Sequence, residues 1–311
     1  MSTGVIFPGQ GSQYVEMGKD FYDSYQAAKA IFEKADSALG FSLSDIIFNG
    51  PEETLTLTYN AQPALLTTSI AIFEIIKDKI YNITGYAGHS LGEYTAVVAA
   101  GGMAFEDAVK AVHNRGKFMQ EAVPVGAGGM LAVIGAKRDS ILQMCEDISK
   151  ETQSILEPAN FNSSAQTVLA GNMQAIEMAL EKYRGYGIKR AIKLPVSAPF
   201  HCSLMKPAAE NMQNYLKDVN VNDLNTPVYS NVDAKKEKKA DTVRENFVKQ
   251  IASPVLWEDL VLNMVADGVE NFIEVGAGSV LTGLMKKVDR KINCINISKT
   301  DDLGKLEDLN V

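Results

Sequence analysis

Short apolar runs alternate with longer segments of helical periodicity over the first part of the chain. Gly4–Phe7 and Ile83–Ala87 are such runs, and each is followed by a glycine-containing turn. Helical patterns cover residues 20–39, 62–79, 93–100 and 105–121. Strands that alternate with helices at this spacing predict a mostly parallel sheet covered by helices, in the α/β class.

The pattern changes at Gly126. Strand-like and helical segments then follow in the order βαββαβ, with strands at 130–135, 155–161, 167–170 and 189–196 and helices at 139–150 and 173–183. This order is typical of a ferredoxin-like unit. The α/β pattern resumes afterwards, with a helix at 203–217 and strands near 227–230, 271–275 and 293–297. We therefore predict a ferredoxin-like subdomain, residues 126–197, inserted into a larger domain formed by residues 1–125 and 198–311.

Composition narrows the class of protein. Of 311 residues, 46% are hydrophobic and 22% are charged, which is typical of a globular enzyme. The net charge of −8 argues against nucleic acid or an anionic membrane as the main partner. The chain begins without a signal-peptide pattern, has no apolar run of about 18 residues, and has three cysteines without a CxxC pair. We expect a cytoplasmic protein with no membrane partner, disulfide framework or zinc site.

Gly88-His89-Ser90-Leu91-Gly92 is a G-x-S-x-G motif between a predicted strand and a predicted helix. In this context the motif is typical of a nucleophile elbow, a sharp turn that projects the serine away from the backbone. The positive end of the following helix would face a developing oxyanion. The alternative is a glycine-rich turn that carries an incidental serine.

A nucleophilic serine needs a base, and the chain has three histidines. We expect the ring of His89 to point away from its neighbour Ser90, because the turn is tight. His113 shares a helix face with charged side chains and is expected to lie on a solvated surface. His201 lies where the inserted unit returns to the larger domain, and such junctions often form cleft walls. His201 is thus the candidate base, and a core histidine is the alternative.

Arg115 is the least expected residue of its helix. Phe105, Ala108, Val112, Arg115 and Met119 are spaced by three and four residues, so they share one face. That face should turn inward, where an arginine is costly without a partner. Arg115 is either an internal salt-bridge partner, with its stem along apolar surface, or a bidentate clamp for an acidic substrate.

The first strand is followed by Gly9-Gln10-Gly11, but no nucleotide-binding fingerprint results. Tyr14 occupies the third glycine position of the dinucleotide motif, and no phosphate-binding G-x-x-x-x-G-K-[ST] occurs. A loop of backbone amides that faces an anion or an oxyanion remains possible here.

Several segments together resemble the malonyl-CoA:acyl-carrier-protein transacylases of fatty-acid synthesis and the acyltransferase domains of polyketide synthases. The segments are Phe7–Gln13, Gln62–Ala64, Gly88–Tyr94, Arg115–Met119, Phe200–Cys202, Asn231–Asp233 and Glu274–Gly278. Each segment alone is a weak indication of the family, but all of them in this order along nearly the whole chain are specific to it. The resemblance implies an α/β-hydrolase-like domain with a parallel sheet and a ferredoxin-like insert.

The resemblance also implies the catalytic residues. Ser90 would be the nucleophile and His201 the general base, oriented by the backbone carbonyl of Gln250 rather than by an acid. The backbone amides of Gln10 and Leu91 would form the oxyanion hole.

Four further positions are implied to bind the substrate. Arg115 would bind the malonyl carboxylate, and Gln62 and Asn160 would line the same site. Phe200 precedes the base, and among polyketide acyltransferases a phenylalanine there accompanies the choice of malonyl over methylmalonyl.

The implied reaction is ping-pong transfer of malonyl from malonyl-CoA to the phosphopantetheine thiol of acyl carrier protein, through a malonyl-serine and without metal or cofactor. The carrier protein of the family is acidic, so we expect a local basic patch to dock it. The candidates are Lys189, Arg190 and Lys193, or Lys286, Lys287, Arg290 and Lys291. The alternatives are a serine esterase or thioesterase, a trans-acting acyltransferase of a polyketide pathway, and a carrier-binding scaffold without turnover.

Overall fold

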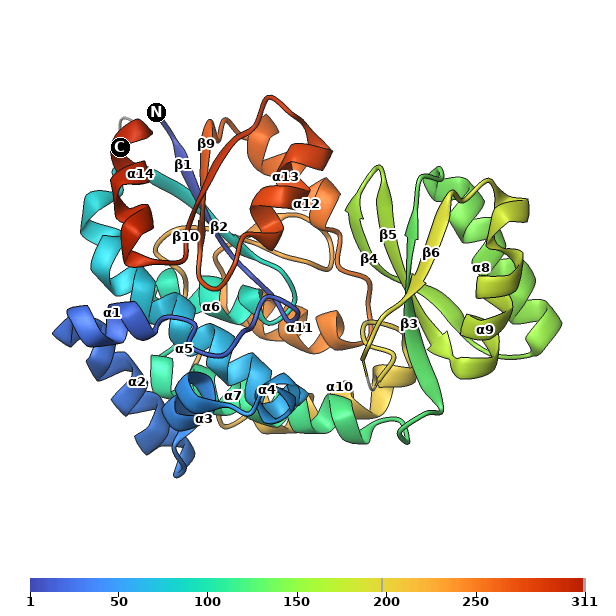
Figure 1. Ribbon diagram of the computed structural model, residues 1–311, viewed down its shortest axis with the longest axis horizontal. Coiled ribbons are helices and arrows are strands. Elements are labelled where there is room, and N and C mark those ends of the chain that lie inside the picture. Colours follow the sequence, from blue (N-terminus) through green and yellow to red (C-terminus); the bar gives the residue numbers. More distant parts are fainter. Residues whose placement is uncertain (197, 310–311) are drawn as a thin grey trace.

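Two β-sheets lie side by side in the structure, a computed structural model that describes residues 1–196 and 198–309 (Figure 1). The larger sheet has the strand order β10-β9-β1-β2-β7-β8. Its strands are β1 (Thr3–Phe7), β2 (Ile83–Gly88), β7 (Val228–Tyr229), β8 (Lys236–Glu237), β9 (Asn271–Val275) and β10 (Asn293–Ile297). All neighbouring pairs are parallel except β7 with β8. The predicted mostly parallel sheet is therefore present.

Helices cover both faces of this sheet. The helices of the larger part are α1 (Lys19–Ser24), α2 (Gln26–Leu39), α3 (Leu43–Asn49), α4 (Glu52–Thr56), α5 (Thr58–Ile76), α6 (Gly92–Ala99), α7 (Phe105–Glu121), α10 (Lys206–Leu216), α11 (Ala240–Ile251), α12 (Trp257–Ala266), α13 (Val280–Val288) and α14 (Lys305–Asp308). Buried residues, polar ones such as Gln62 included, occupy almost every position of α5, because it lies among other helices. Among residues 1–196 and 198–309, no helix has the length and apolar character of a membrane span.

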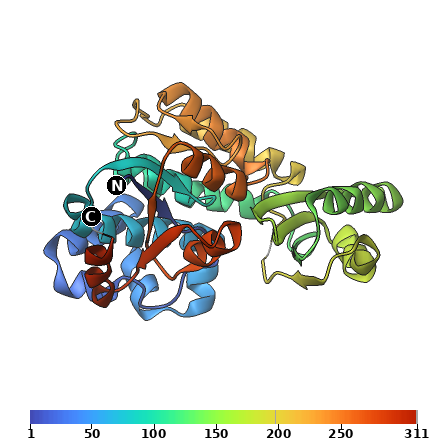
Figure 2. The same ribbon diagram turned by 90° about the horizontal axis from the view of Figure 1, so that it is seen from above.

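The smaller sheet is antiparallel and has the order β4-β5-β3-β6. Its elements are β3 (Gly128–Ile134), α8 (Arg138–Thr152), β4 (Leu156–Ser163), β5 (Gln166–Asn172), α9 (Met173–Lys182) and β6 (Arg190–Lys193). The chain thus follows the predicted βαββαβ order. Figure 2 shows this unit extending from the larger part of the molecule.

Alternate side chains of β3 pack in two different hydrophobic cores. Leu131 and Val133 pack with α8 and α9 in a separate apolar cluster. Met130 and Ala132 belong instead to the main core of the molecule. Because successive side chains of a strand point to opposite faces, the small sheet is covered by its own helices on one side and by the larger part on the other.

Backbone hydrogen bonds also join the two parts. The amide of Phe161 donates to the carbonyl of Val255 at 2.9 Å, and the amide of Val255 donates to the carbonyl of Ala159 at 2.8 Å. Asn160, between them on β4, forms a parallel bridge with Val255. β4 is therefore fixed to the segment that leads into α12.

Some boundaries differ from the predicted ones. The single helix predicted for residues 20–39 is wrong, because Tyr25 is extended (φ −130°, ψ 118°) and separates α1 from α2. The helices α3, α4, α11, α12 and α13 were not predicted. The domain limits at 125/126 and 197/198 remain a prediction, and residues 197 and 310–311 lie outside the described residues.

Candidate active site

The G-x-S-x-G segment forms a tight turn between β2 and α6. Ser90 has a φ of 54°, in the left-handed region that an L-residue adopts at a cost. The two glycines allow the close approach of the backbone on either side. A Cβ atom on Gly88 would lie 1.9 Å from the carbonyl oxygen of Gly92, and one on Gly92 would lie 2.4 Å from that of Phe7. Only glycine fits at these two positions.

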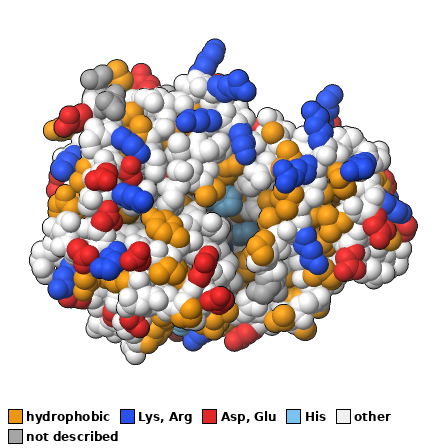
Figure 3. Space-filling model, viewed as in Figure 1, with side chains coloured by type: hydrophobic (Ala, Val, Ile, Leu, Met, Phe, Trp, Pro, Cys, Tyr) orange, Lys and Arg blue, Asp and Glu red, His pale blue; other side chains and the backbone are white. Residues whose placement is uncertain are grey.

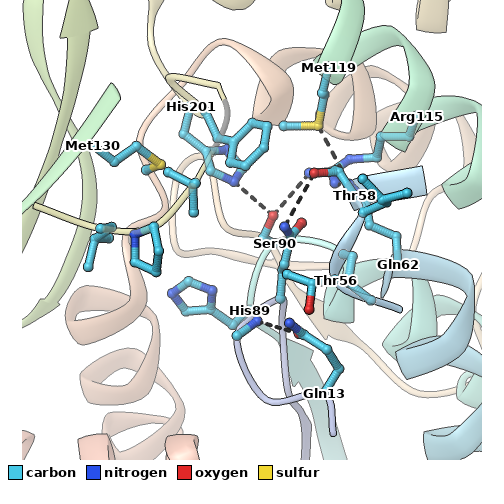
Figure 4. A pocket seen from close by; sticks show the side chains of 18 of the residues that line it. Gln13, Thr56, Thr58, Gln62, His89, Ser90, Arg115, Met119, Met130 and His201 are labelled. Atoms are coloured by element: carbon cyan, nitrogen blue, oxygen red, sulfur yellow. Dashed lines mark hydrogen bonds between the residues drawn. The ribbon is translucent and has the colours of Figure 1, made fainter. Parts of the chain in front are cut away.

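Ser90, His201 and Gln250 form a chain of hydrogen bonds (Figure 4). Ser90 Oγ lies 2.8 Å from His201 Nε2, and His201 Nδ1 lies 2.8 Å from the backbone oxygen of Gln250. A carbonyl oxygen can only accept, so Nδ1 carries the proton and Nε2 can accept the proton of Ser90. Burial, assisted by the charge of Arg115, lowers the pKa of His201 to about 3. The imidazole is therefore neutral at neutral pH, as a general base must be.

The side chain of Asn231 hydrogen-bonds to the backbone of this turn. Its Oδ1 accepts from the backbone amide of Ser90 at 2.7 Å, and its Nδ2 donates to the carbonyl of Gly88 at 2.8 Å. Its own amide donates to the carboxylate of Glu93 at 3.0 Å. Sequence reasoning gave Asn231 and Glu93 no role, and only their place within the two motifs signalled them.

Two backbone amides in the cavity wall are available to an oxyanion. The amides of Gln10 and Leu91 have no acceptor within the described part of the chain, and both residues line the cavity. The amide of Ser90 is not available, because Asn231 accepts from it. The role of these two amides as an oxyanion hole stays a prediction.

Arg115 is fully buried, and its guanidinium reaches the nucleophile. Nη1 donates to Gln62 Oε1 at 2.8 Å, while Nη2 donates to Gln250 Oε1 at 2.7 Å and to Ser90 Oγ at 3.1 Å. No carboxylate in residues 1–196 and 198–309 lies within 4.0 Å of its nitrogens, so the internal salt-bridge alternative is wrong. A buried guanidinium without a carboxylate beside a serine can bind an acidic acyl group.

These side chains surround a cavity of about 760 Å³. Of the predicted site residues, Ser90, His201, Gln10, Leu91, Arg115, Phe200, Gln62 and Asn160 line it. Gln250 does not line the cavity itself. Its side chain and its backbone oxygen accept hydrogen bonds from Arg115 and His201, which do. The smaller sheet and the segment after it add Met130 and residues 194–196. Figure 3 shows the hollow, with histidine side chains at its base.

The other two histidines differ in part from expectation. The ring of His89 is turned away from Ser90, with Nε2 2.9 Å from Asn162 Oδ1, yet the residue lines the cavity. Desolvation lowers the pKa of His89. The solvated surface predicted for His113 is wrong, because its ring is half-buried against Phe41 and Tyr59, with Nδ1 2.7 Å from the Tyr59 carbonyl.

Known proteins are similar to this chain in both sequence and fold. The acyl transferase domain family matches residues 5–306. A malonyl CoA-acyl carrier protein transacylase of Bacillus subtilis (strain 168) is 45% identical over 298 residues, covering 96% of this chain and 94% of that protein. The chain therefore belongs to the acyl transferase family, and it is an acyltransferase.

Solved structures agree with this assignment. An acyl carrier protein S-malonyltransferase from Vibrio cholerae is similar with a TM-score of 0.95 and 39% identity, covering 98% of this chain and all of that one. A malonyl-transacylase in complex with its type II polyketide synthase acyl-carrier protein has a TM-score of 0.95 and 39% identity, covering 99% of this chain and 100% of that one. The predicted fold class, an α/β-hydrolase-like core with a small ferredoxin-like unit, is confirmed.

Proposed function

We propose that this chain transfers malonyl from malonyl-CoA to the phosphopantetheine thiol of acyl carrier protein, in fatty-acid synthesis. One observation carries the choice of acyl group: the Arg115 guanidinium, which has no carboxylate partner in residues 1–196 and 198–309, lies 3.1 Å from Ser90 Oγ. The names of the relatives from Bacillus subtilis and Vibrio cholerae support the same reaction.

The first half-reaction forms an ester on Ser90. His201 Nε2 accepts the proton of Ser90 as Oγ attacks the thioester carbonyl, and the amides of Gln10 and Leu91 donate to the oxyanion. When the C–S bond breaks, the CoA sulfur takes the proton from His201 and leaves as a thiol. Malonyl remains attached to Ser90 Oγ.

The second half-reaction reverses these steps with another thiol. The phosphopantetheine thiol gives its proton to His201, and its sulfur attacks the ester carbonyl. Ser90 Oγ leaves and recovers the proton. The Gln250 carbonyl holds the imidazole in the tautomer that both steps need.

Four side chains select the acyl group in this proposal. Arg115 pairs with the malonyl carboxylate, and Gln62 fixes one edge of the guanidinium through its bond to Nη1. Phe200, which precedes His201 and lines the cavity, limits the room for an α-methyl branch. Asn160 lines the wall on the side of the smaller sheet.

A basic patch near the cavity docks the carrier protein in this proposal. Lys189, Arg190 and Lys193 are exposed, and residues 194–196, which follow them, line the cavity. In Figure 3, Lys and Arg side chains stand above and to the right of the hollow. The carrier protein bound by the similar polyketide malonyl-transacylase supports a carrier partner here.

The three cysteines are unpaired and buried, which agrees with a cytoplasmic location.

Mass spectrometry of the intact chain tests the function. After incubation with malonyl-CoA the chain should gain one malonyl group on Ser90, and addition of holo carrier protein should remove it and malonylate the carrier. Ser90→Ala should reduce ester formation by about 10⁴-fold or more, because among the described residues Ser90 is the hydroxyl paired with His201. Rapid release of free malonate without carrier protein would instead identify a hydrolase, and absence of any adduct would identify a scaffold.

A further inference from the structure

Glu93 is a buried carboxylate that the mechanism above does not use. It lies in the first turn of α6, three residues after the nucleophile, and is 3% exposed. Its Oε2 accepts from the amide of Asn231 at 3.0 Å and from Gln250 Nε2 at 2.7 Å. No ion pair joins it to a lysine or arginine among the described residues. A buried carboxylate in such a place needs an explanation.

The side-chain amide of Gln250 has only one favourable orientation. Its Nε2 faces three acceptors, namely Glu93 Oε2, the carbonyl of Ser90 at 3.0 Å and Asn231 Oδ1 at 3.3 Å. Its Oε1 faces the Nη2 donor of Arg115 at 2.7 Å. If the amide were rotated by 180°, Oε1 would face the three acceptors, and Nε2 would face the Arg115 guanidinium, which can only donate. Glu93, which makes the shortest of the three contacts with Nε2, thus helps to fix the orientation in which Gln250 can accept from Arg115.

The amide therefore connects a buried carboxyl group to a buried guanidinium. Burial raises the pKa of Glu93 to about 7, while the hydrogen bonds from Asn231 and Gln250 and the charge of Arg115 oppose this rise, so the ionised form prevails above about pH 7. Burial lowers the pKa of Arg115, and the charge of Glu93 opposes that fall. An amide between a carboxylate and a guanidinium is polarised by both, which strengthens each hydrogen bond.

We propose that Glu93 is a positioning residue for the acyl carboxylate: through the Gln250 side chain it acts as the indirect counter-ion of Arg115 and holds the guanidinium beside Ser90. This inference rests on the proposed malonyl transfer. Gln250 then has two separate tasks, since its backbone oxygen orients His201 and its side chain orients Arg115. An indirect counter-ion leaves the guanidinium able to pair with a substrate carboxylate, which a direct salt bridge would block.

Acylation of Ser90 by two donors tests the inference. Glu93→Ala should lower kcat/KM for malonyl-CoA by about 10- to 100-fold, the usual effect of losing a hydrogen bond to a charged group. Glu93→Gln can still accept hydrogen bonds but lacks the charge, so its loss should be smaller, about three- to tenfold. With acetyl-CoA, which has no carboxylate for Arg115, both variants should stay within about threefold of the unmodified chain.

A second buried carboxylate provides the matched control. Glu274 is also fully buried, but it accepts from the amides of Leu281 and Thr282 at the start of α13. Glu274→Gln should lower the melting temperature without changing the malonyl-to-acetyl ratio. If Glu93 acts through Arg115, then Glu93→Gln should not change that ratio further in an Arg115→Ala background.

The possible failures are distinguishable. Equal losses with both donors, or an unchanged ratio, in a folded Glu93→Gln variant would overturn the positioning role while malonyl transfer by the unmodified chain still stands. A further change of the ratio in the Arg115→Ala background would also overturn it. If the unmodified chain forms no malonyl ester, both proposals are wrong. Should Glu93→Ala fail to fold, the Glu93→Gln variant and the double variant decide the question.

Discussion

The two sheets contribute to the cavity in different ways. The larger part provides all the side chains that hydrogen-bond at the nucleophile, and these bonds link Ser90, His201, Arg115 and Gln250 in one buried network. The smaller sheet provides wall residues such as Met130, and it has no hydrogen bond to Ser90, His201 or Arg115 in the part of the chain described. Among the described residues, the hydrogen-bonded network at the nucleophile therefore comes from the larger part, whereas both parts line the cavity, and substitutions should separate these two contributions.

The largest expected effect lies at the centre of the network. Arg115→Ala should lower malonyl transfer by about 30- to several-thousand-fold, because losing one partner of a desolvated charged pair typically costs ~2–5 kcal/mol. Acetyl transfer should change much less, since acetyl has no carboxylate. Steady-state kinetics with both acyl-CoA donors measures the difference.

A conservative variant sharpens this prediction. Arg115→Lys should recover part of the malonyl activity, because an ammonium keeps the charge but cannot form the two-pronged contact. Melting temperatures of the same variants provide the control for folding. Parallel losses with malonyl and acetyl donors would contradict the assigned role of Arg115.

Phe200 lies where the two parts meet, next to the base and packed in the main core. Phe200→Ser should make room beside the acyl α-carbon and raise methylmalonyl relative to malonyl transfer. A methyl group in an apolar pocket changes specificity by about 10- to 200-fold at most. Competition between the two donors gives the ratio directly, and an unchanged ratio would place selectivity elsewhere in the wall.

The basic residues of the smaller unit should influence the carrier protein rather than the acyl group. Changing Lys189, Arg190 and Lys193 to glutamate should raise the KM for carrier protein by about three- to tenfold at low salt, because exposed charges are strongly screened. The kinetics of Ser90 acylation by malonyl-CoA should not change. The matched control reverses Lys286, Lys287, Arg290 and Lys291, which lie in and after α13 on the larger part. If only this control weakens carrier binding, the docking patch is on the larger part.

The smallest effect concerns pH. Because the pKa of His201 is lowered to about 3, its imidazole should remain neutral throughout the range from pH 8 to 5. The rate of Ser90 acylation by acetyl-CoA, measured by rapid quench, should therefore stay nearly constant over that range. An ordinary histidine would lose half of its basic form near pH 6.5. An inflection between pH 6 and 7 that persists in the Glu93→Gln variant would show that His201 is less desolvated than its surroundings indicate, because Glu93 itself has a pKa of about 7.

Local patterns were sufficient to predict the elbow and much of the fold. The glycines at positions 88 and 92 indicated the turn, and the spacing of α7 placed Arg115 on an inward face before its partners were known. The predicted ranges of α7, β9 and β10 match the observed ones, because each has a clear periodicity or an apolar run between turn residues.

Contacts across long sequence separations could not be predicted in the same way. Glu93 and Gln250 are 157 residues apart, and nothing in their local sequence shows that their side chains meet. The break at Tyr25 was missed for another reason, since helical periodicity continues on both sides of it. A single extended residue leaves that pattern almost unchanged.

The order of strands in the larger sheet has a consequence for synthesis on the ribosome. β1 lies between β2 and β9, so one of its two neighbours is made only when the ribosome reaches Asn271. The smaller sheet needs only Gly128–Lys193, and its pairings are local. Local pairings form quickly, whereas distant ones wait for the whole chain. The nascent chain therefore carries a nearly complete small unit while its first strand is paired with β2 but still lacks β9, and the larger sheet can be completed only after residue 271 has been made.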